Sequence, residues 1–198
     1  YFKFWDKDAR QNKIGTTSCI YVMDAFSEVC VGHYNCDRET FLTTYEALRN
    51  AFEATGFLPC ELVSDNQAGF KSKAAQRWRA KLECISHTTT PENGKSKSIE
   101  AAFGRFQAEV LHQFINYTGG NITAKSSKTK TDPRVILQNV EALPTYEEVI
   151  ATNEACIKQW NSMPHPKFVG KSRLQVYQES VNPQAIALTD VIREKVFY

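Results

Sequence analysis

Two acidic residues stand thirty-five positions apart, at two different kinds of element boundary. Asp65 follows the strand-like run 58–64, and Glu100 lies at the start of a long amphipathic pattern that begins at Ile99. The end of a strand and the start of a helix are places where a fold can hold carboxylates rigidly toward one point. Hard divalent cations require carboxylates that converge in this way. The pair predicts a fold of strands and helices in which Asp65 and Glu100 are catalytic residues and metal ligands.

The residues around the two acids resemble those of a known group of proteins. The turn Asp65-Asn66-Gln67-Ala68-Gly69 is similar to the pattern Asp-Asn-x-x-Gly, and the segment 91–100 is similar to the approach Pro-x-Asn-Gly-x-x-Lys-x-x-Glu to a helix. Both resemble the surroundings of the second and third acids in DDE transposases and retroviral integrases. The run 20–32 resembles the hairpin before the first helix of these families, and 99–104 is most similar to the phage Mu-type branch. The resemblance covers residues 1–120.

The resemblance implies both a fold and an activity. The fold would be α/β and RNase H-like, a mixed five-stranded sheet flanked by helices, with a C-terminal helical extension. The activity would be that of a polynucleotidyl transferase of a mobile element, the catalytic core of a DNA transposase or integrase, which nicks DNA and transfers the 3'-OH strand. The implied cofactors are two Mg²⁺ or Mn²⁺ ions, which serve the attacking and leaving oxygens. The implied partners are transposon ends, target DNA and further copies of the chain assembled on DNA.

A third acid is expected, because two carboxylates do not comfortably fix two metal ions. In the resembled families this acid lies on the first strand, opposite Asp65. Asp24 matches a family position that is often acidic without being a ligand, and a hairpin turn near residues 9–12 would place Asp6 and Asp8 in that turn. The position on the first strand that faces Asp65 then falls at or just before Tyr1. We expect the first acid upstream of Tyr1 in a longer protein, with Asp6 or Asp8 as the next alternative and Asp24 as the last.

The segment around the two acids is basic, although the whole chain carries a net charge of only +2. Residues 71–97 hold seven Lys or Arg against two acidic residues. A local surplus of this kind suits a substrate lined with phosphates. For the central part of this basic segment, 77–81, the alternative to a DNA contact is a helix face exposed to solvent. The residues expected to contact DNA are Lys71, Lys73, Lys95, Lys97 and Asn66, with Lys97 one turn before Glu100 if the helix begins early.

Each acid also has a structural interpretation. Asp65 could cap the turn that follows it, and Glu100 could be a first-turn glutamate favoured by the helix dipole. Two other functions also stay open. One is a nuclease of the RNase H or resolvase type, and the other is a non-catalytic module for DNA binding and assembly. The shared spacing and flanks of both acids favour the transposase or integrase.

Cysteine usage indicates where the protein works. The six cysteines form no CxxC pair, and most lie in apolar runs where a reduced cysteine behaves as a small hydrophobe. This favours a reducing cytosol, and the resemblance implies a cytoplasmic, nucleoid-associated protein. No apolar run reaches 18 residues, so no membrane association is expected. The pairs His33/Cys36 and Cys84/His87 could build a zinc site only if they converged, and we expect them to serve packing instead.

Length and composition fit one core with a small appendage, at 198 residues and 42% hydrophobic content. We expect a core domain over 1–120, a basic connector over 121–134, a helical extension that completes the core over 135–180, and a tail over 181–198 that could start a further domain. The expected strands are 1–5, 19–26, 28–34, 60–64 and 82–86. The expected helices are 37–55, 74–79, 99–117, 145–160 and 172–180, of which the first is capped by Asp37 and stopped by Gly56.

Overall fold

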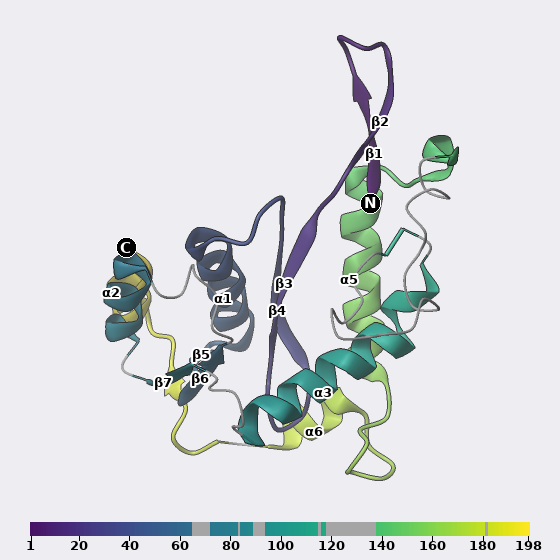
Figure 1. The fold of residues 1–198 in the computed structure, drawn as a ribbon. Helices are drawn as coiled ribbons and strands as arrows, with labels where there is room; N and C mark the ends of the chain where they lie inside the picture. Colours follow the sequence, from purple (N-terminus) through teal and green to yellow (C-terminus); the bar gives the residue numbers. More distant parts are fainter. Residues whose placement is uncertain (65–71, 83, 89–93, 115, 118–137, 181) are drawn as a thin grey trace.

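The protein is a mixed α/β structure, as expected (Figure 1). A computed structural model describes residues 1–64, 72–82, 84–88, 94–114, 116–117, 138–180 and 182–198, without the side chains of 86–88 and 94–98. Asp65, Asn66, Lys71 and the basic connector 121–134 lie outside the described residues. The division into core, connector, extension and tail stays a prediction.

The described strands form four pairs. Three are antiparallel: β1 (Phe2–Asp6) with β2 (Gln11–Gly15), β3 (Ser18–Met23) with β4 (Cys30–Cys36), and β5 (Phe57–Leu58) with β8 (Ile186–Ala187). The fourth pair is parallel, β6 (Glu61–Ser64) with β7 (Ile85–Thr88). The expected five-stranded sheet is not formed by the strands that the structure describes. Within the described ranges, β3 pairs with β4 alone and β6 pairs with β7 alone.

The N-terminal hairpin corrects one sequence prediction. Residues 6–17 belong to none of the expected strands, but 11–15 form β2, which pairs with β1 from Phe2 opposite Gly15 to Asp6 opposite Gln11. The Asp6 carboxylate accepts hydrogen bonds from the backbone N–H groups of Asp8 and Ala9, both at 2.9 Å. These bonds close the turn and bring the two strands together. The polar residues of β2 therefore form backbone hydrogen bonds with β1, although their own sequence does not favour a strand.

Helix α1 (Phe41–Thr55) packs tightly against β4. Its N-cap is Thr40, which forms a capping box with Thr43, rather than Asp37 as predicted. Its C-cap is Gly56 with a φ of 73°, the left-handed conformation that glycine adopts without strain. A Cβ at Gly32 of β4 would lie within 2.6 Å of the Ala51 backbone, so only glycine permits this approach.

The C-terminal stretch folds back onto the core. Helix α7 (Asp190–Phe197) lies beside α2 (Lys73–Lys81), as Figure 1 shows. The Trp78 indole N–H donates to the Val196 carbonyl at 3.1 Å, and the Tyr45 hydroxyl donates to the Phe197 carbonyl at 2.9 Å. The stretch 181–198, expected to be a tail, therefore supplies buried residues to the core.

Helix α3 (Gly94–Glu109) is shorter than predicted. The predicted helix continued to residue 117, but the chain leaves the α-helix at Val110 (φ −121°, ψ −55°) and forms the short 3₁₀ helix η2 (Leu111–Gln113). Val110 and Leu111 are both buried. Both pack in the cluster that also holds Phe106 and Trp160.

The remaining helices cover the opposite end of the molecule. They are η4 (Val140–Ala142), α5 (Tyr146–Ser162) and α6 (Arg173–Glu179). α5 begins with a capping box, since the Thr145 hydroxyl accepts from the Glu148 N–H and the Glu148 carboxylate accepts from the Thr145 N–H. In Figure 1, β1 rises from the upper end of α5, while α3 and α6 cross near the lower end of α5.

Two clusters of buried side chains hold these elements. The first joins α1, β6, α2 and α7 through Leu48, Phe52, Leu62, Trp78, Leu82, Val196 and Phe197. The second joins the start of β4, α3 and α5 through Cys30, Phe106, Val110, Leu111, Cys156, Ile157 and Trp160. Strand β3 contributes to both, because alternate residues of a strand point to opposite faces. Val22 packs on the first cluster, and Tyr21 and Met23 pack on the second.

Candidate active site

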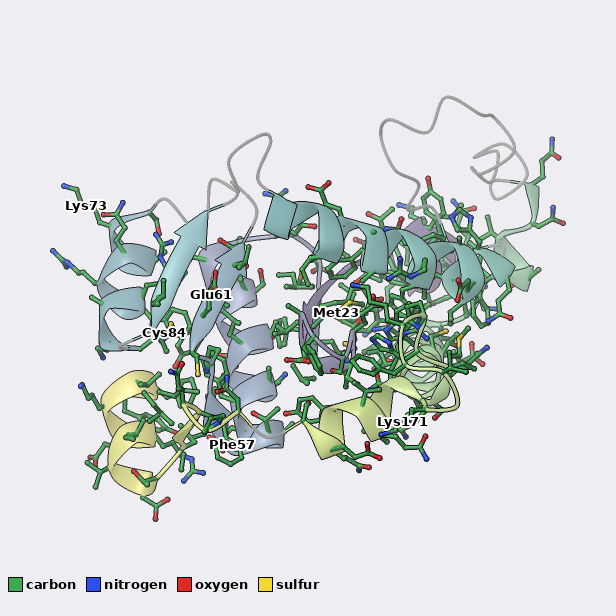
Figure 2. All side chains as sticks on the ribbon, turned by 90° about the horizontal axis from the view of Figure 1, so that it is seen from below. Met23, Phe57, Glu61, Lys73, Cys84 and Lys171 are labelled. Carbon is green, nitrogen blue, oxygen red and sulfur yellow. The ribbon has the colours of Figure 1, made fainter. Side chains whose placement is uncertain are left out.

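A cleft of about 1630 Å³ opens between β3 and β6. Every residue of both strands lines it, with α1 and α3 contributing further walls. In Figure 2, Met23 of β3 and Glu61 of β6 lie on opposite sides of this space. The cleft therefore lies at the junction of the two core clusters, where side chains from distant parts of the sequence meet.

Glu100 lines this cleft from α3. Its side chain is exposed, whereas Ala102 and Phe106 of the same helix are buried. Gln107, two turns further along, lines the same cleft, and a Cβ added at Gly104 would meet nothing within 4 Å. Glu100 therefore lies off the buried side of its helix. The carboxylate is presented to a space that a substrate or cation can enter.

The carboxyl end of β6 opens into the same cleft. Ser64 is the last residue of β6, lines the cleft and directly precedes Asp65 in the sequence. Its buried hydroxyl has no hydrogen-bond partner among the residues that the structure describes. The structure thus brings the end of β6 and Glu100 to one cavity.

The alternative first acids have different surroundings. Asp6 and Asp8 lie at the tip of the β1–β2 hairpin and do not line the cleft. The hydrogen bond from the Ala9 backbone, with the neighbouring Lys13 at 2.5 Å, lowers the pKa of Asp6. Asp24 does line the cleft, but its Oδ2 accepts from the Ser27 N–H at 2.7 Å and the Ser27 hydroxyl at 2.6 Å. Each of Asp6 and Asp24 therefore has a local role in a turn.

The predicted DNA-binding lysines divide between two helices. Lys73 is exposed at the start of α2 and does not line the cleft, and Figure 2 shows it at the outer side of the molecule. Lys95 and Lys97 lie in the first turns of α3, whose start at Gly94 puts Lys97 one turn before Glu100. Of Lys73, Lys95 and Lys97, Lys97 is the lysine nearest to Glu100 along the chain.

A buried ionic network, which sequence analysis missed, holds α3 in place. Glu28 is 8% exposed and has a φ of 62°, and its carboxylate lies 2.5 Å from Arg105 of α3 and 3.6 Å from Arg173 of α6. The Arg173 guanidinium stacks 3.4 Å from the centre of the Trp160 ring, and the Trp160 indole donates to the Glu28 carbonyl at 2.7 Å. Nothing in the sequence around Glu28 marks it as buried, because its partners are 77 or more positions away.

The cleft wall formed by β3 is strongly desolvated. Burial raises the pKa of Cys19 to about 11 and raises the pKa of Tyr21 well above its ordinary value. The Tyr21 hydroxyl donates to Asn153 of α5 at 2.5 Å. These groups therefore stay neutral near pH 7. A wall that is shielded from water has a low effective dielectric constant. A low dielectric constant strengthens the attraction between a carboxylate and a cation bound nearby.

The described residues alone do not complete a metal centre. No group of three or more His, Cys, Asp or Glu side chains comes together within the described ranges. Glu100 has the hard oxygen donors that Mg²⁺ prefers and faces a cavity. A complete site would need carboxylates in addition to those described. No helix in the described part of the chain is both long and apolar enough to cross a membrane.

Comparisons with known proteins identify the class of fold. No family model and no curated protein matches the chain. A chain of the simian T-cell lymphotropic virus intasome in complex with PP2A regulatory subunit B56 gamma matches 93% of this chain with a TM-score of 0.55 and 17% identity. The match covers 54% of that chain, so this protein spans about half its length. This likeness shows an integrase-like fold.

Two further structures are HTLV-2 integrase catalytic core domains in complex with magnesium. The dimeric form has a TM-score of 0.48 and 17% identity over 78% of this chain and 80% of that chain. The trimeric form has a TM-score of 0.49 and 16% identity over 82% of this chain and 92% of that chain. None of the three structures supports the closer resemblance to phage Mu-type transposases.

Proposed function

We propose that this chain is the catalytic core of a DNA transposase or integrase, a polynucleotidyl transferase that nicks DNA and joins a 3'-OH end to target DNA. One observation carries the proposal: Glu100 and the end of β6, where Asp65 follows, open into a single cleft. The integrase-like fold supports it. Transposon ends and target DNA would be the substrates, with further copies of the chain assembled on them.

Asp65 and Glu100 would hold the divalent cations. When bound, two Mg²⁺ or Mn²⁺ ions supply activation of the attacking oxygen and stabilisation of the leaving 3'-oxygen. Their third carboxylate would come from upstream of Tyr1, because Asp6 caps a turn away from the cleft and Asp24 is bound by Ser27. Glu100 is suited to its role because the Glu28–Arg105 ion pair anchors the same helix five residues further along.

The protein's own residues would position the DNA. Lys97 would contact a phosphate beside Glu100, with Lys95 next to it, and Asn66 would orient the substrate after β6. Lys71 and Lys73 would contact the backbone further out, since Lys73 is exposed and outside the cleft. Gly104 leaves space on the Glu100 side of α3 for a DNA strand to approach. Contacts with phosphates place the backbone without reading its sequence.

The direct test is cation binding by Glu100. Binding of Mn²⁺ to the chain, measured by electron paramagnetic resonance, should weaken at least about tenfold in Glu100→Gln, since loss of a charged ligand removes a strong interaction. Glu194→Gln is the matched control, because Glu194 is exposed on α7 and does not line the cleft. Equal Mn²⁺ affinity in all three proteins would contradict the assignment of Glu100.

A second assay separates transposase from nuclease. A polypeptide that extends ahead of Tyr1 is incubated with labelled DNA ends and a supercoiled plasmid in Mg²⁺. Joined products are expected from a transposase or integrase, whereas cleavage without joining would indicate the nuclease. Neither reaction, together with retained DNA binding, would indicate the non-catalytic assembly module.

A further inference from the structure

Two half-buried cysteines lie at equivalent positions of neighbouring strands. Cys60 directly precedes β6, and Cys84 directly precedes β7. The parallel register pairs Glu61 with Ile85, so one step back it places Cys60 beside Cys84. The pairing extends to this step, because the Ile85 N–H donates to the Cys60 carbonyl at 3.1 Å. Figure 2 shows Cys84 beside the strand that carries Glu61. The two thiols therefore share one cross-strand position.

The spacing of such a position suits a bond between the two sulfurs. Neighbouring strands lie about 4.7–4.9 Å apart, and the Cα atoms of a disulfide usually lie about 4.4–6.8 Å apart. Residues at one cross-strand position also point to the same face of the sheet. Burial raises the pKa of the Cys84 thiol, and the charge of a nearby Cys60 thiolate raises it further. This electrostatic effect requires the two sulfurs to lie near each other.

The other four cysteines lack this arrangement, and the structure describes all six. In the β3–β4 register, three of them stand opposite other residues: Cys19 opposite Asn35, Cys30 opposite Met23 and Cys36 opposite Ser18. The fourth, Cys156, lies on α5. Three of these four are buried: Cys30, Cys36 and Cys156. Only the pair Cys60/Cys84 therefore combines facing thiols with access from solvent.

We propose that Cys60 and Cys84 form a reversible disulfide when the protein meets an oxidised small-molecule disulfide of the glutathione type. One cysteine thiolate attacks a sulfur of the reagent, which breaks the reagent's S–S bond, forms a mixed disulfide and releases one small thiol. The other cysteine then attacks the protein sulfur of the mixed disulfide and releases the second small thiol. The reagent gains the two electrons that the protein thiols lose, and the two protons end on the released thiols.

Cys60 is suited to make the first attack, because the Asn182 amide donates to its sulfur at 3.3 Å and a hydrogen-bond donor stabilises a thiolate. The bond ties the amino ends of β6 and β7, whereas Asp65 follows the carboxyl end of β6. It closes a loop over 60–84 that carries α2. A half-exposed disulfide of this kind is labile, so a reducing cytosol opens it again. The inference does not rest on the proposed catalysis.

Oxidation of the folded, reduced 198-residue chain with oxidised glutathione tests the proposal. Remaining thiols are blocked with N-ethylmaleimide, and peptides are mapped by mass spectrometry without reduction. A Cys60–Cys84 bond should form at least about tenfold faster than any other disulfide within the chain, because the fold holds these two sulfurs together. In urea this preference should disappear, since chain proximity alone then decides which thiols meet. Cys84→Ser should instead accumulate a glutathione adduct at Cys60. Cys19→Ser is the matched control and should keep the full yield, because Cys19 is the remaining half-buried cysteine.

Three results would overturn the proposal. Glutathione adducts on Cys60 and Cys84 without a bond between them would show that the two sulfurs do not meet. Dimers linked through either cysteine, in place of a bond within one chain, would show the same. Equal rates of bond formation in the folded and the urea-unfolded chain would attribute the bond to proximity in the sequence and not to the pairing of β6 with β7. The chain without substitutions provides the decisive measurement, so a variant that fails to fold leaves the result intact.

Discussion

The Arg105 guanidinium lies 2.5 Å from the Glu28 carboxylate and joins α3 to the turn between β3 and β4. Glu28 is the buried member of this pair, and Arg173 approaches the other oxygen of the same carboxylate at 3.6 Å. One buried carboxylate therefore lies close to two cations from two helices. Removing it leaves both cations without their partner, which costs more than the pair contributes when it is intact.

We expect Glu28→Ala to lower the free energy of unfolding by about 3 kcal/mol, in the range for breaking a buried ion pair. Glu28→Gln should cost less, because its amide oxygen still accepts a hydrogen bond. Arg105→Ala should have the smallest effect, since its side chain is one-third exposed. Urea unfolding of the three variants measures the order. A smaller loss for Glu28→Ala than for Arg105→Ala would refute the central role of Glu28.

Protonation of the His33 side chain should contribute to the pH dependence of stability. Burial lowers the pKa of His33 below its ordinary value, while Glu154 opposes the shift. The folded protein therefore binds this proton less readily than the unfolded chain, so the associated stability is full above the unfolded pKa of about 6.5 and is lost as pH falls through the folded pKa. Thermal unfolding between pH 7.5 and 5 should show a smaller loss for His33→Asn. Glu154→Gln should show a larger loss, and identical profiles for all three proteins would exclude His33 as the source.

Two glycines should respond to alanine in opposite directions. Gly104 has open space around its Cβ position and lies inside α3, so Gly104→Ala should raise stability by about 0.5–1 kcal/mol. Gly32→Ala should lower stability by about 1–3 kcal/mol, because its Cβ would lie 2.6 Å from the Ala51 backbone. Urea midpoints of both variants check the signs. Stabilisation by Gly32→Ala would mean that α1 and β4 are packed more loosely than described.

Cation binding should stabilise the fold through Glu100. A ligand that binds only the folded state at ten times its dissociation constant adds about 1.4 kcal/mol to the free energy of unfolding. Saturating Mg²⁺ should therefore raise the melting temperature of the 198-residue chain and of Glu194→Gln, and EDTA should reverse the rise. Glu100→Gln should lose most of it. A full shift in Glu100→Gln would place the cation at another site.

Lys97 should contribute to DNA binding through one phosphate contact. Lys97→Ala should reduce the slope of log affinity against log salt by about 0.9 for duplex DNA, equally for cognate and random sequences. Lys158→Ala is the control, because Lys158 is exposed on α5 and does not line the cleft. Fluorescence anisotropy over a salt series measures both slopes. An unchanged slope for Lys97→Ala would mean that Lys97 contacts solvent and not a DNA phosphate.

Local signals in the sequence determined several helix ends and faces. The capping box of Thr145 and Glu148 starts α5, and Gly56 stops α1, because these effects involve residues only a few positions apart. The amphipathic pattern that begins at Ile99 likewise predicted the helix that carries Glu100. The resemblance around Asp65 and Glu100 predicted an integrase-like fold, which the similarity to the intasome chain supports.

Only the tertiary structure decided which of these elements meet. The Glu28 network joins residues 77 or more positions apart, and the return of α7 to α2 depends on apolar surface that α2 leaves uncovered. α3 ends at Glu109, just before Val110 and Leu111 join the second cluster, whereas the helical periodicity itself continued to residue 117. The cleft likewise gathers residues of β3, β6, α1 and α3 from distant parts of the sequence. Long-range pairing and burial depend on the whole chain, so a local pattern does not specify them.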